Sequence, residues 1–283
     1  MYKKLCFFFA ACALVSLSGL AQQDDPNNNI QGTATRATGD VVTSFATGTA
    51  GGTPVGLEHD GNGGLLITDI GDGSINFMDL TGSVSSSFAG VGNPIGITTD
   101  GVNIYQTDTT SDAVIIFNSA GTQTGSFSVA TETTFPEGIT YNPNTGNLYV
   151  VSGSGENYVA EYTTAGTLLG TFPINGSSQD GIAFAYDYYW IYDSGTDLVR
   201  RYDTSFNEVG NFGGTSAAGF GTGEGLAVVG DVLYVCATGA DTVVGFDISE
   251  FAIMVPTLGE YGMAAFVVLL IAAGIFLMRR NRV

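Results

Sequence analysis

Basic residues are scarce in this 283-residue sequence, which has eight lysines and arginines against 27 aspartates and glutamates. Only Arg36, Arg200 and Arg201 lie between the two apolar ends of the chain. Every acidic residue except Glu260 also lies there, so residues 22–254 carry a net charge of −23. A surface this acidic repels phosphate backbones and anionic lipid headgroups. We therefore expect no nucleic-acid partner, whereas divalent cations and basic ligands suit this charge.

Histidine and cysteine are also scarce, which removes several kinds of catalytic site. The one histidine, His59, lies in a turn-like segment, so a histidine base and a multi-histidine metal site lack their parts. Outside the first 21 residues Cys236 is the only cysteine, so no internal disulfide forms. These absences favour a non-catalytic protein. A carboxylate-only mechanism stays open, either a metal-assisted lactonase or a glycosidase with paired acids.

The N-terminal end has the pattern of a secretory signal. Lys3 and Lys4 precede an apolar stretch over residues 5–17, and Gly19-Leu20-Ala21 offers small residues to a signal peptidase. We predict a signal peptide over residues 1–21 and an exported protein. Cleavage of the lipoprotein type at Cys12 is the alternative. Residues 22–38, rich in polar residues, are predicted to be a disordered leader.

Five glycines divide the middle of the chain at nearly even intervals. They are separated by 40, 42, 43 and 44 residues, and each is followed by leucine or isoleucine: Gly56, Gly96, Gly138, Gly181 and Gly225. Each repeat holds four short segments rich in β-branched and aromatic residues, separated by turns of Gly, Asp, Asn and Ser. This pattern predicts the blades of a β-propeller, with the aromatic residues in the core and the glycines at a crowded axis.

The number of blades follows from an incomplete repeat. The fifth repeat has three predicted strands, over residues 225–229, 233–236 and 243–248, and then stops. Residues 39–45 match residues 82–88, the last strand of the first repeat, and can supply the missing strand. We therefore predict an all-β fold, a single five-bladed β-propeller over residues 39–251 that is closed by an N-terminal strand.

The repeats resemble the NHL-repeat propellers. The second repeat carries the resemblance best, in Pro94-Ile95-Gly96-Ile97, Asp100-Gly101, Ile104-Tyr105, Asp108 and Gly121. The resemblance implies the propeller fold and says little about function, because propellers host lyases, lactonases, lectins and scaffolds. NHL propellers more often have six blades, so a five-bladed ring departs from that pattern.

The C-terminal end combines a short motif, an apolar run and a basic tail. Residues 252–262 form a linker and motif, residues 263–278 carry no charge, and residues 279–283 include three arginines. The run predicts a transmembrane helix with the basic tail in the cytoplasm and the propeller on the periplasmic or outer side. A plain membrane anchor is the simplest interpretation of this end.

The motif itself resembles the IPTL-CTERM family of bacterial sorting signals. Pro256, Thr257, Leu258, Glu260 and Gly262 match that family, whereas Val255, Gly259 and Tyr261 are substitutions within it. The resemblance implies processing by an exosortase, a membrane-embedded cysteine transpeptidase, and then display at the cell surface or release outside the cell. Extracellular polysaccharide or a protein is the partner expected there.

Three carboxylates stand out as a candidate site. Glu137, Asp180 and Glu224 directly precede their blade glycines, so all three should lie at one mouth of the axial channel. The loops after the second strands add further acids: Asp69, Asp72, Asp108, Asp112, Glu156, Asp193, Asp197 and Asp241. Clustered carboxylates attract a hard cation such as Ca²⁺, the one cofactor suggested here, or share a proton. Acids that shape turns and keep an exported protein soluble are the alternative.

These observations predict a binding or scaffold propeller with a glycan or protein ligand, displayed outside the cell. Glu137, Asp180 and Glu224 are its expected ligand-binding and metal-ligating residues. The alternative is a cation-dependent hydrolase or lactonase that uses the same three carboxylates. A metal with open coordination positions would favour the enzyme.

Overall fold

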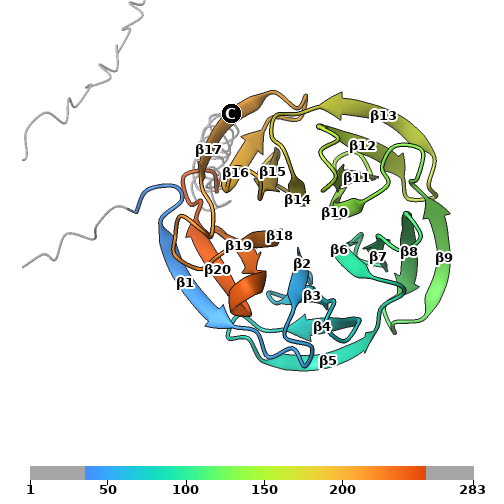
Figure 1. The fold of residues 1–283 in the computed structure, drawn as a ribbon, viewed down its shortest axis with the longest axis horizontal. Helices are drawn as coiled ribbons and strands as arrows, with labels where there is room; N and C mark the ends of the chain where they lie inside the picture. Colours follow the sequence, from blue (N-terminus) through green and yellow to red (C-terminus); the bar gives the residue numbers. More distant parts are fainter. Residues whose placement is uncertain (1–35, 253–283) are drawn as a thin grey trace, which may run out of the picture. The chain divides into compact units, whose positions relative to one another are not determined.

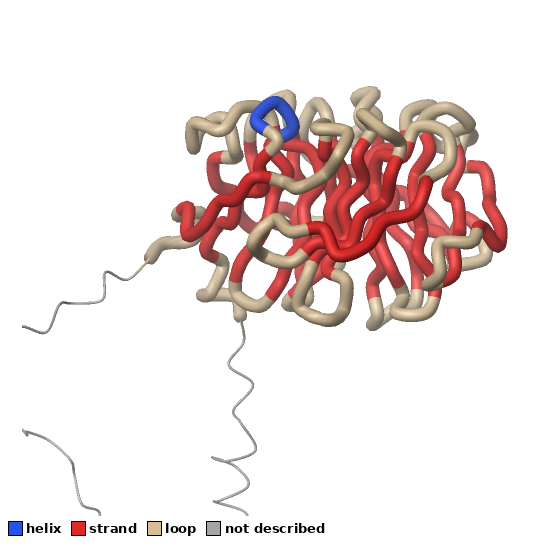
Figure 2. Tube along the Cα trace, turned by 90° about the horizontal axis from the view of Figure 1, so that it is seen from below, coloured by secondary structure: helices blue, strands red, loops and turns tan. Residues whose placement is uncertain are grey.

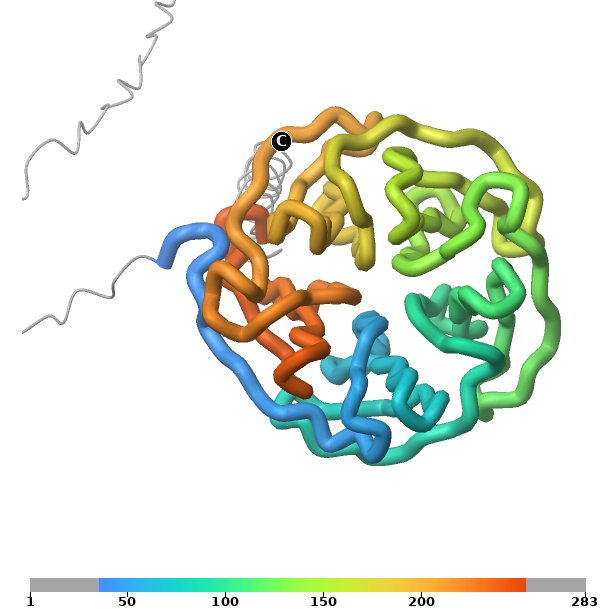
Figure 3. The backbone as a smooth tube through the Cα atoms, viewed as in Figure 1, coloured from blue at the N-terminus to red at the C-terminus, as the bar shows by residue number. Residues whose placement is uncertain are grey.

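The computed structural model describes residues 36–252, which form five four-stranded antiparallel sheets around one axis (Figure 1). The predicted signal peptide, leader residues 22–35, sorting motif, transmembrane run and basic tail lie outside the described residues. Within residues 36–252, no helix is long and apolar enough to cross a membrane. The smooth trace in Figure 3 shows that the chain completes the blades one after another around the ring.

Four blades are continuous in sequence, and each runs outward from its innermost strand. Blade 1 consists of β2 (Pro54–His59), β3 (Leu65–Asp69), β4 (Ser74–Met78) and β5 (Val84–Ala89). Blade 2 consists of β6 (Pro94–Thr99), β7 (Asn103–Asp108), β8 (Ala113–Asn118) and β9 (Gln123–Ser128). Blade 3 consists of β10 (Pro136–Asn142), β11 (Asn147–Ser152), β12 (Tyr158–Thr163) and β13 (Leu168–Pro173). Blade 4 consists of β14 (Gln179–Ala185), β15 (Tyr188–Asp193), β16 (Leu198–Tyr202) and β17 (Glu208–Gly213).

Blade 5 is assembled from both ends of the described chain, as predicted. Its strands β18 (Gly223–Val229), β19 (Val232–Ala237) and β20 (Thr242–Asp247) are completed by β1 (Val41–Ala46). In Figure 1 the blue β1 lies along the orange-red β20. The pairing is antiparallel, with Val41 opposite Phe246 and Phe45 opposite Val243. A turn from Ala37 to Asp40 adds a hydrogen bond from Gly39 N–H to the Asp247 carbonyl (2.9 Å). The closing strand removes two open sheet edges.

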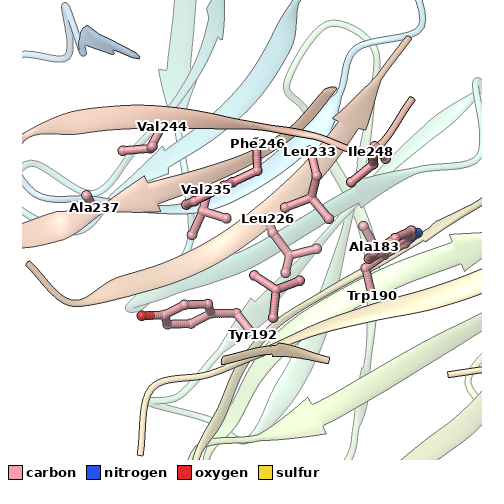
Figure 4. Packing of buried hydrophobic residues seen from close by; sticks show 11 residues of the cluster. Ala183, Trp190, Tyr192, Leu226, Leu233, Val235, Ala237, Val244, Phe246 and Ile248 are labelled. Carbon is pink, nitrogen blue, oxygen red and sulfur yellow. The ribbon is translucent and has the colours of Figure 1, made fainter. Parts of the chain in front are cut away.

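Large apolar residues pack between neighbouring blades, because a four-stranded blade cannot bury both faces alone. Figure 4 shows this packing between blades 4 and 5, where Trp190 and Tyr192 of β15 face Leu226 of β18 and Val235 of β19. The predicted aromatic column of the second strands is buried throughout: Tyr105, Tyr149, Trp190 and Tyr234. The outermost phenylalanines pack in a similar way; the ring of Phe88 lies 5.4 Å from that of Phe117 in the next blade. The assignment of the second-strand aromatic residues to the core is confirmed, whereas the outermost phenylalanines are half-buried.

The blade glycines lie where the innermost strands crowd together. A Cβ atom on Gly138 would lie 2.8 Å from the Gly181 Cα, and one on Gly225 would lie 2.7 Å from the Gly56 Cα. Such contacts exclude any side chain, so a glycine is required at these positions. A register irregularity marks the start of every innermost strand at its glycine. The ring can therefore close on a narrow axis.

The ring has two faces, which the strand directions define. The entry face is the one at which the innermost strands begin, and the exit face is the one at which they end. In the side view of Figure 2, the single short helix η1 (Thr238–Ala240) lies among the loops of one face. This is the entry face, because η1 follows Ala237, which pairs with Gly223 at the start of β18.

Candidate functional site: a carboxylate mouth on the entry face

The five residues that precede the blade glycines surround the axis on the entry face. Val55 and Ile95 occupy this position in blades 1 and 2, whereas Glu137, Asp180 and Glu224 occupy it in blades 3, 4 and 5. The sequence analysis assumed that the innermost strands of all blades run in the same direction. The structure has this strand direction, so the three acids lie at the same end of the ring. We call Glu137, Asp180 and Glu224 the carboxylate mouth.

The structure brings the three carboxylates together. Each offers an oxygen atom, and these atoms all lie within 4.8 Å of one another. Glu137 is 8% exposed and Asp180 is 5% exposed, whereas Glu224 is half-buried. Within the described chain this is the only group of three or more acidic, cysteine or histidine side chains that meets the geometry of a metal site. The site itself contains only oxygen donors, which suits a hard cation.

The hydrogen bonds around the mouth leave one carboxylate unsatisfied. Asp180 accepts hydrogen bonds from the Ser178 hydroxyl (3.2 Å) and from the Ser194 N–H (3.1 Å). The Oε2 atom of Glu137 is buried and has no partner among the described residues. Gly153 backs this carboxyl so closely that a Cβ there would overlap it. A buried acceptor without a donor costs about 1–3 kcal/mol. The fold therefore holds Glu137 in place and leaves its buried Oε2 atom without a donor.

The electrostatics of the mouth disfavour three separate negative charges. Burial, together with the nearby carboxyls of Asp180 and Glu224, raises the pKa of Glu137 far above its ordinary value. Burial and the charge of Asp180 raise the pKa of Glu224 to about 7. Without a cation, the cluster relieves its repulsion by keeping protons. With a divalent cation present, the same three groups can ionise and supply three negatively charged oxygen ligands.

The other half of the mouth is apolar, and the channel behind it is closed. Val55 is 4% exposed and Ile95 is 7% exposed. Below them the axis is lined by the five blade glycines and the leucine or isoleucine after each, which leave a void of about 10 Å³. That volume is at the lower limit for one water molecule. A ligand can therefore bind at the mouth but cannot pass through the ring.

Six of the eight loop acids predicted from the sequence accept hydrogen bonds from loop residues, whereas a buried oxygen of Asp112 (Oδ1) and one of Asp69 (Oδ2) have no partner among the described residues. Asp108 accepts hydrogen bonds from the N–H groups of Asn93 (2.7 Å) and Thr110 (3.0 Å) and from the Ser111 hydroxyl. Similar bonds to loop N–H or hydroxyl groups occupy Asp69, Asp72, Glu156, Asp193 and Asp197. None of these acids joins the carboxylate mouth in the described chain. The interpretation of these residues as turn formers fits the structure better than a cation site.

The surroundings of Cys236 and His59, the remaining candidates, do not support nucleophilic catalysis. Burial and the charges of Glu224 and Asp69 raise the pKa of the Cys236 thiol, so it stays protonated and unreactive. His59 accepts a hydrogen bond at Nε2 from the Gly63 N–H within its own turn (3.2 Å). Neither residue is paired with a base or nucleophile in the described part of the ring.

One acidic residue on the exit face escaped the sequence analysis. Glu58 accepts hydrogen bonds from the Thr98 hydroxyl (2.5 Å) and the His59 N–H (2.8 Å), and burial raises its pKa to about 7. It lies two residues after its blade glycine, where blades 2 and 3 have Thr98 and Thr140. Those hydroxyls accept the N–H groups of Tyr141 and Phe184 in the next blade. The available signal was one glutamate in an aligned column that otherwise holds threonine in blades 2 and 3 and alanine in blades 4 and 5.

Comparisons with known proteins support the fold. No family model matches the chain, and no curated protein matches it either. Glutaminyl cyclase from Myxococcus xanthus is similar in structure, with a TM-score of 0.61 and 16% identity over 75% of this chain and 97% of that one. A chain of a nidogen/laminin complex is similar with a TM-score of 0.54 and 22% identity, over 70% of this chain and 77% of that chain. At these identities the likeness shows the five-bladed ring as a known type of fold and nothing about activity.

Proposed function

We propose that this protein is an exported binding propeller that holds a divalent cation, most suitably Ca²⁺, at its carboxylate mouth. The observation that carries the proposal is the buried, unpartnered Oε2 atom of Glu137, with the Asp180 and Glu224 carboxylates within 4.8 Å. Ca²⁺ takes six to eight oxygen ligands. Three carboxylates leave coordination positions for water or for an oxygen of a bound glycan or protein.

The proposed setting is outside the cell, in agreement with both chain ends. The N-terminal pattern supports cleavage by a signal peptidase, and the motif from Val255 to Gly262 supports sorting by an exosortase. The chain leaves the ring on the exit face. Phe251 packs edge-on against Tyr188 (5.9 Å between ring centroids), whose partner Ala185 lies at the end of β14 opposite to Asp180. An anchor beyond Phe251 would thus leave the carboxylate mouth free for an extracellular ligand.

The cation is tested by thermal unfolding of residues 22–252. We expect millimolar Ca²⁺ to raise Tm, because an ion that binds only the folded state stabilises it. Glu137→Gln combined with Glu224→Gln should remove most of that rise. The matched control is Asp72→Asn combined with Asp241→Asn, which removes the same charge from exposed loops of the entry face. If Tm does not change with Ca²⁺, the three carboxylates do not bind this ion and the proposal is wrong.

A cation-dependent hydrolase or lactonase is the second function that the mouth supports. A cation held by Glu137, Asp180 and Glu224 would polarise a carbonyl oxygen or activate a bound water molecule for its attack. Hydrolysis of a panel of lactones and esters, measured with Ca²⁺ and with a chelator, tests this alternative. Activity that requires the cation and disappears in Glu224→Gln would establish it over a purely binding role.

Sorting is tested separately, at the other end of the chain. Pro256→Ala should block processing and leave a membrane-retained precursor, because the motif and not the apolar run is what an exosortase would recognise. Pro26→Ala, in the predicted leader, is the control. Unchanged display or release of Pro256→Ala after cell fractionation would reduce the tail to an ordinary anchor.

A further inference from the structure

A second cavity lies on the exit face, at the opposite end of the ring from the carboxylate mouth. It has a volume of about 280 Å³ and forms where β2, β6 and β10 end and turn back into their second strands. The residues that give it chemical character are Glu58, His59, Asp60, Thr140, Tyr141 and Phe184. These six residues come from blades 1, 3 and 4, so the cavity exists only where the blades pack side by side.

Two aromatic rings form part of the wall. Tyr141 at the end of β10 and Phe184 in β14 are both half-buried, so each retains exposed ring surface. Their backbones are held by hydrogen bonds from the Tyr141 N–H to Thr98 (3.0 Å) and from the Phe184 N–H to Thr140 (3.1 Å). Rigid aromatic surfaces beside a few polar groups are typical of sites for small, amphipathic ligands. The apolar face of a sugar ring is a ligand surface of that kind.

Polar groups with unused hydrogen-bonding capacity complete the lining. His59 uses Nε2 as an acceptor, so in the neutral ring the proton is on Nδ1, which is left to donate. Asp60 accepts two backbone N–H groups at Oδ1, from Asn62 (2.7 Å) and Gly64 (2.8 Å). Its Oδ2 receives no hydrogen bond from the described residues. A donor and an acceptor in one small cavity suit the hydroxyl groups of a sugar, each of which can donate and accept.

The negative charge of the cavity limits further which sugars can bind there. Glu58, Asp60 and Asp100 line it, and no lysine or arginine of the described chain does. Such a surface repels sugars that carry carboxylates or sulfates and tolerates neutral or amine-bearing sugars. We propose that the exit-face cavity is a saccharide-binding site for a neutral or amine-bearing sugar unit of a glycan. This proposal deepens the proposed binding function but does not depend on a cation at the carboxylate mouth.

Calorimetric titration of the full chain, in a detergent without a sugar headgroup, tests the proposal. The probes are cellotetraose, the glucosamine tetramer and tetragalacturonic acid. We expect binding of one or both of the first two and at least a tenfold weaker binding of the anionic probe. Phe184→Ala should weaken binding at least tenfold by removing the aromatic wall. Phe135→Ala removes an exposed phenylalanine just before β10 on the entry face and should leave binding unchanged.

A second variant guards against loss of folding in Phe184→Ala. His59→Ala removes the donor from a turn, and it should weaken binding while Tm stays close to that of the native chain. Failure of all three probes, equal binding of the anionic probe, or full binding by a folded Phe184→Ala or His59→Ala would overturn the proposal. Saccharide titration in a chelating buffer should show the same binding as with Ca²⁺, whatever the ion does to Tm. The two proposals can therefore fail independently.

Discussion

The ring has two unlike arcs, and blades 1 and 2 differ from blades 3 to 5 in how they meet the axis. In the first arc the mouth residues are Val55 and Ile95, and the second strands carry Thr68 and Thr107. The Thr68 hydroxyl accepts the N–H of its own blade glycine (2.8 Å) and donates to the Ile95 carbonyl of the next blade. The Thr107 hydroxyl does the same towards Glu137, whose carbonyl it reaches at 2.5 Å. Each hydroxyl thus joins two blades and satisfies two buried backbone groups.

The second arc lacks these bridges and has the carboxylates. Val151, Tyr192 and Cys236 occupy the positions of the bridging threonines, and the blade glycines abut one another directly. In the first arc, the threonine hydroxyls satisfy the buried backbone groups, and no added proton or ion is needed. The second leaves the Glu137 carboxylate without a donor, so its stability depends on a proton or a cation. One side of the axis is thus held by hydroxyl bridges between blades, and the other side carries the three carboxylates.

Removal of β1 should have the largest effect, because it opens the second arc at its outer edge. Without residues 22–46, β20 becomes an unpaired edge and Phe45 leaves the core beside Tyr234. We expect a loss comparable to the folding free energy of a domain, about 5–15 kcal/mol. Thermal unfolding of residues 47–252 against 22–252 measures it. Deletion of residues 22–36 alone keeps the Ala37–Asp40 turn and should be harmless; equal melting of both truncations would mean that β1 does not close the ring.

Two substitutions at the bridging position, Thr107→Val and Val151→Thr, test whether the hydroxyl bridges stabilise the first arc and not the second. Thr107→Val should cost about 1–3 kcal/mol, because the buried Gly96 N–H and Glu137 carbonyl lose their partner. Val151→Thr should give no gain, since the side chain of Val151 packs tightly against Gly138, which in turn abuts Gly181. Urea unfolding of both variants measures the two values. If both substitutions lower the free energy of unfolding by the same amount, the hydroxyl bridges do not distinguish the two arcs.

Conversion of the second arc to the apolar type should stabilise the cation-free protein. Glu137→Ile with Glu224→Val gives the mouth the residue types of blades 1 and 2, and replaces two carboxyl groups that burial disfavours by hydrocarbon. We expect a gain of about 1–2 kcal/mol in a chelating buffer at neutral pH, measured by urea unfolding. Asp72→Asn with Asp241→Asn again serves as the control for net charge. Destabilisation in the chelating buffer would mean that the carboxylates stabilise the ring without any ion.

The smallest effect concerns pH and the first arc. The pKa of Glu58 is raised from 4.5 to about 7 by burial, so the folded state binds its proton more tightly than the unfolded state. This stabilisation is complete below pH 4.5 and is lost as the pH rises through about 7. Glu58→Gln, which resembles the protonated acid, should therefore be more stable than the native chain at pH 8 and about equally stable at pH 4. A difference that does not vary with pH would contradict the assignment.

Much of the fold could be predicted from local sequence patterns, as the following residues show. The spacing of Gly56, Gly96 and the later blade glycines marked each innermost strand, because only glycine fits that crowded axis. The match of residues 39–45 to residues 82–88 identified the closing strand, since a repeat must pair with a neighbouring repeat to bury its faces. The position of Glu137, Asp180 and Glu224 before their glycines placed them at one mouth, because equivalent residues of equivalent strands share an end of the ring.

Other features depended on contacts between residues far apart in sequence. Asp108 and Asp193 were open to two interpretations, and only the folded loops show their carboxylates bound to backbone N–H groups. Glu58 was overlooked because its partner, Thr98, is 40 residues away. The exit-face cavity unites ends of strands from separate blades, so no single segment of sequence contains it.

By itself, the sequence determined the repeat, the number of blades, the closing strand and the charge of the chain, because periodicity and composition are local properties. Only the tertiary structure decided which carboxylates meet, which of them lacks a donor, and where a cavity remains. Distances and hydrogen-bond partners depend on how five blades pack around one axis, and small shifts in that packing decide whether an acid binds the backbone or stays free.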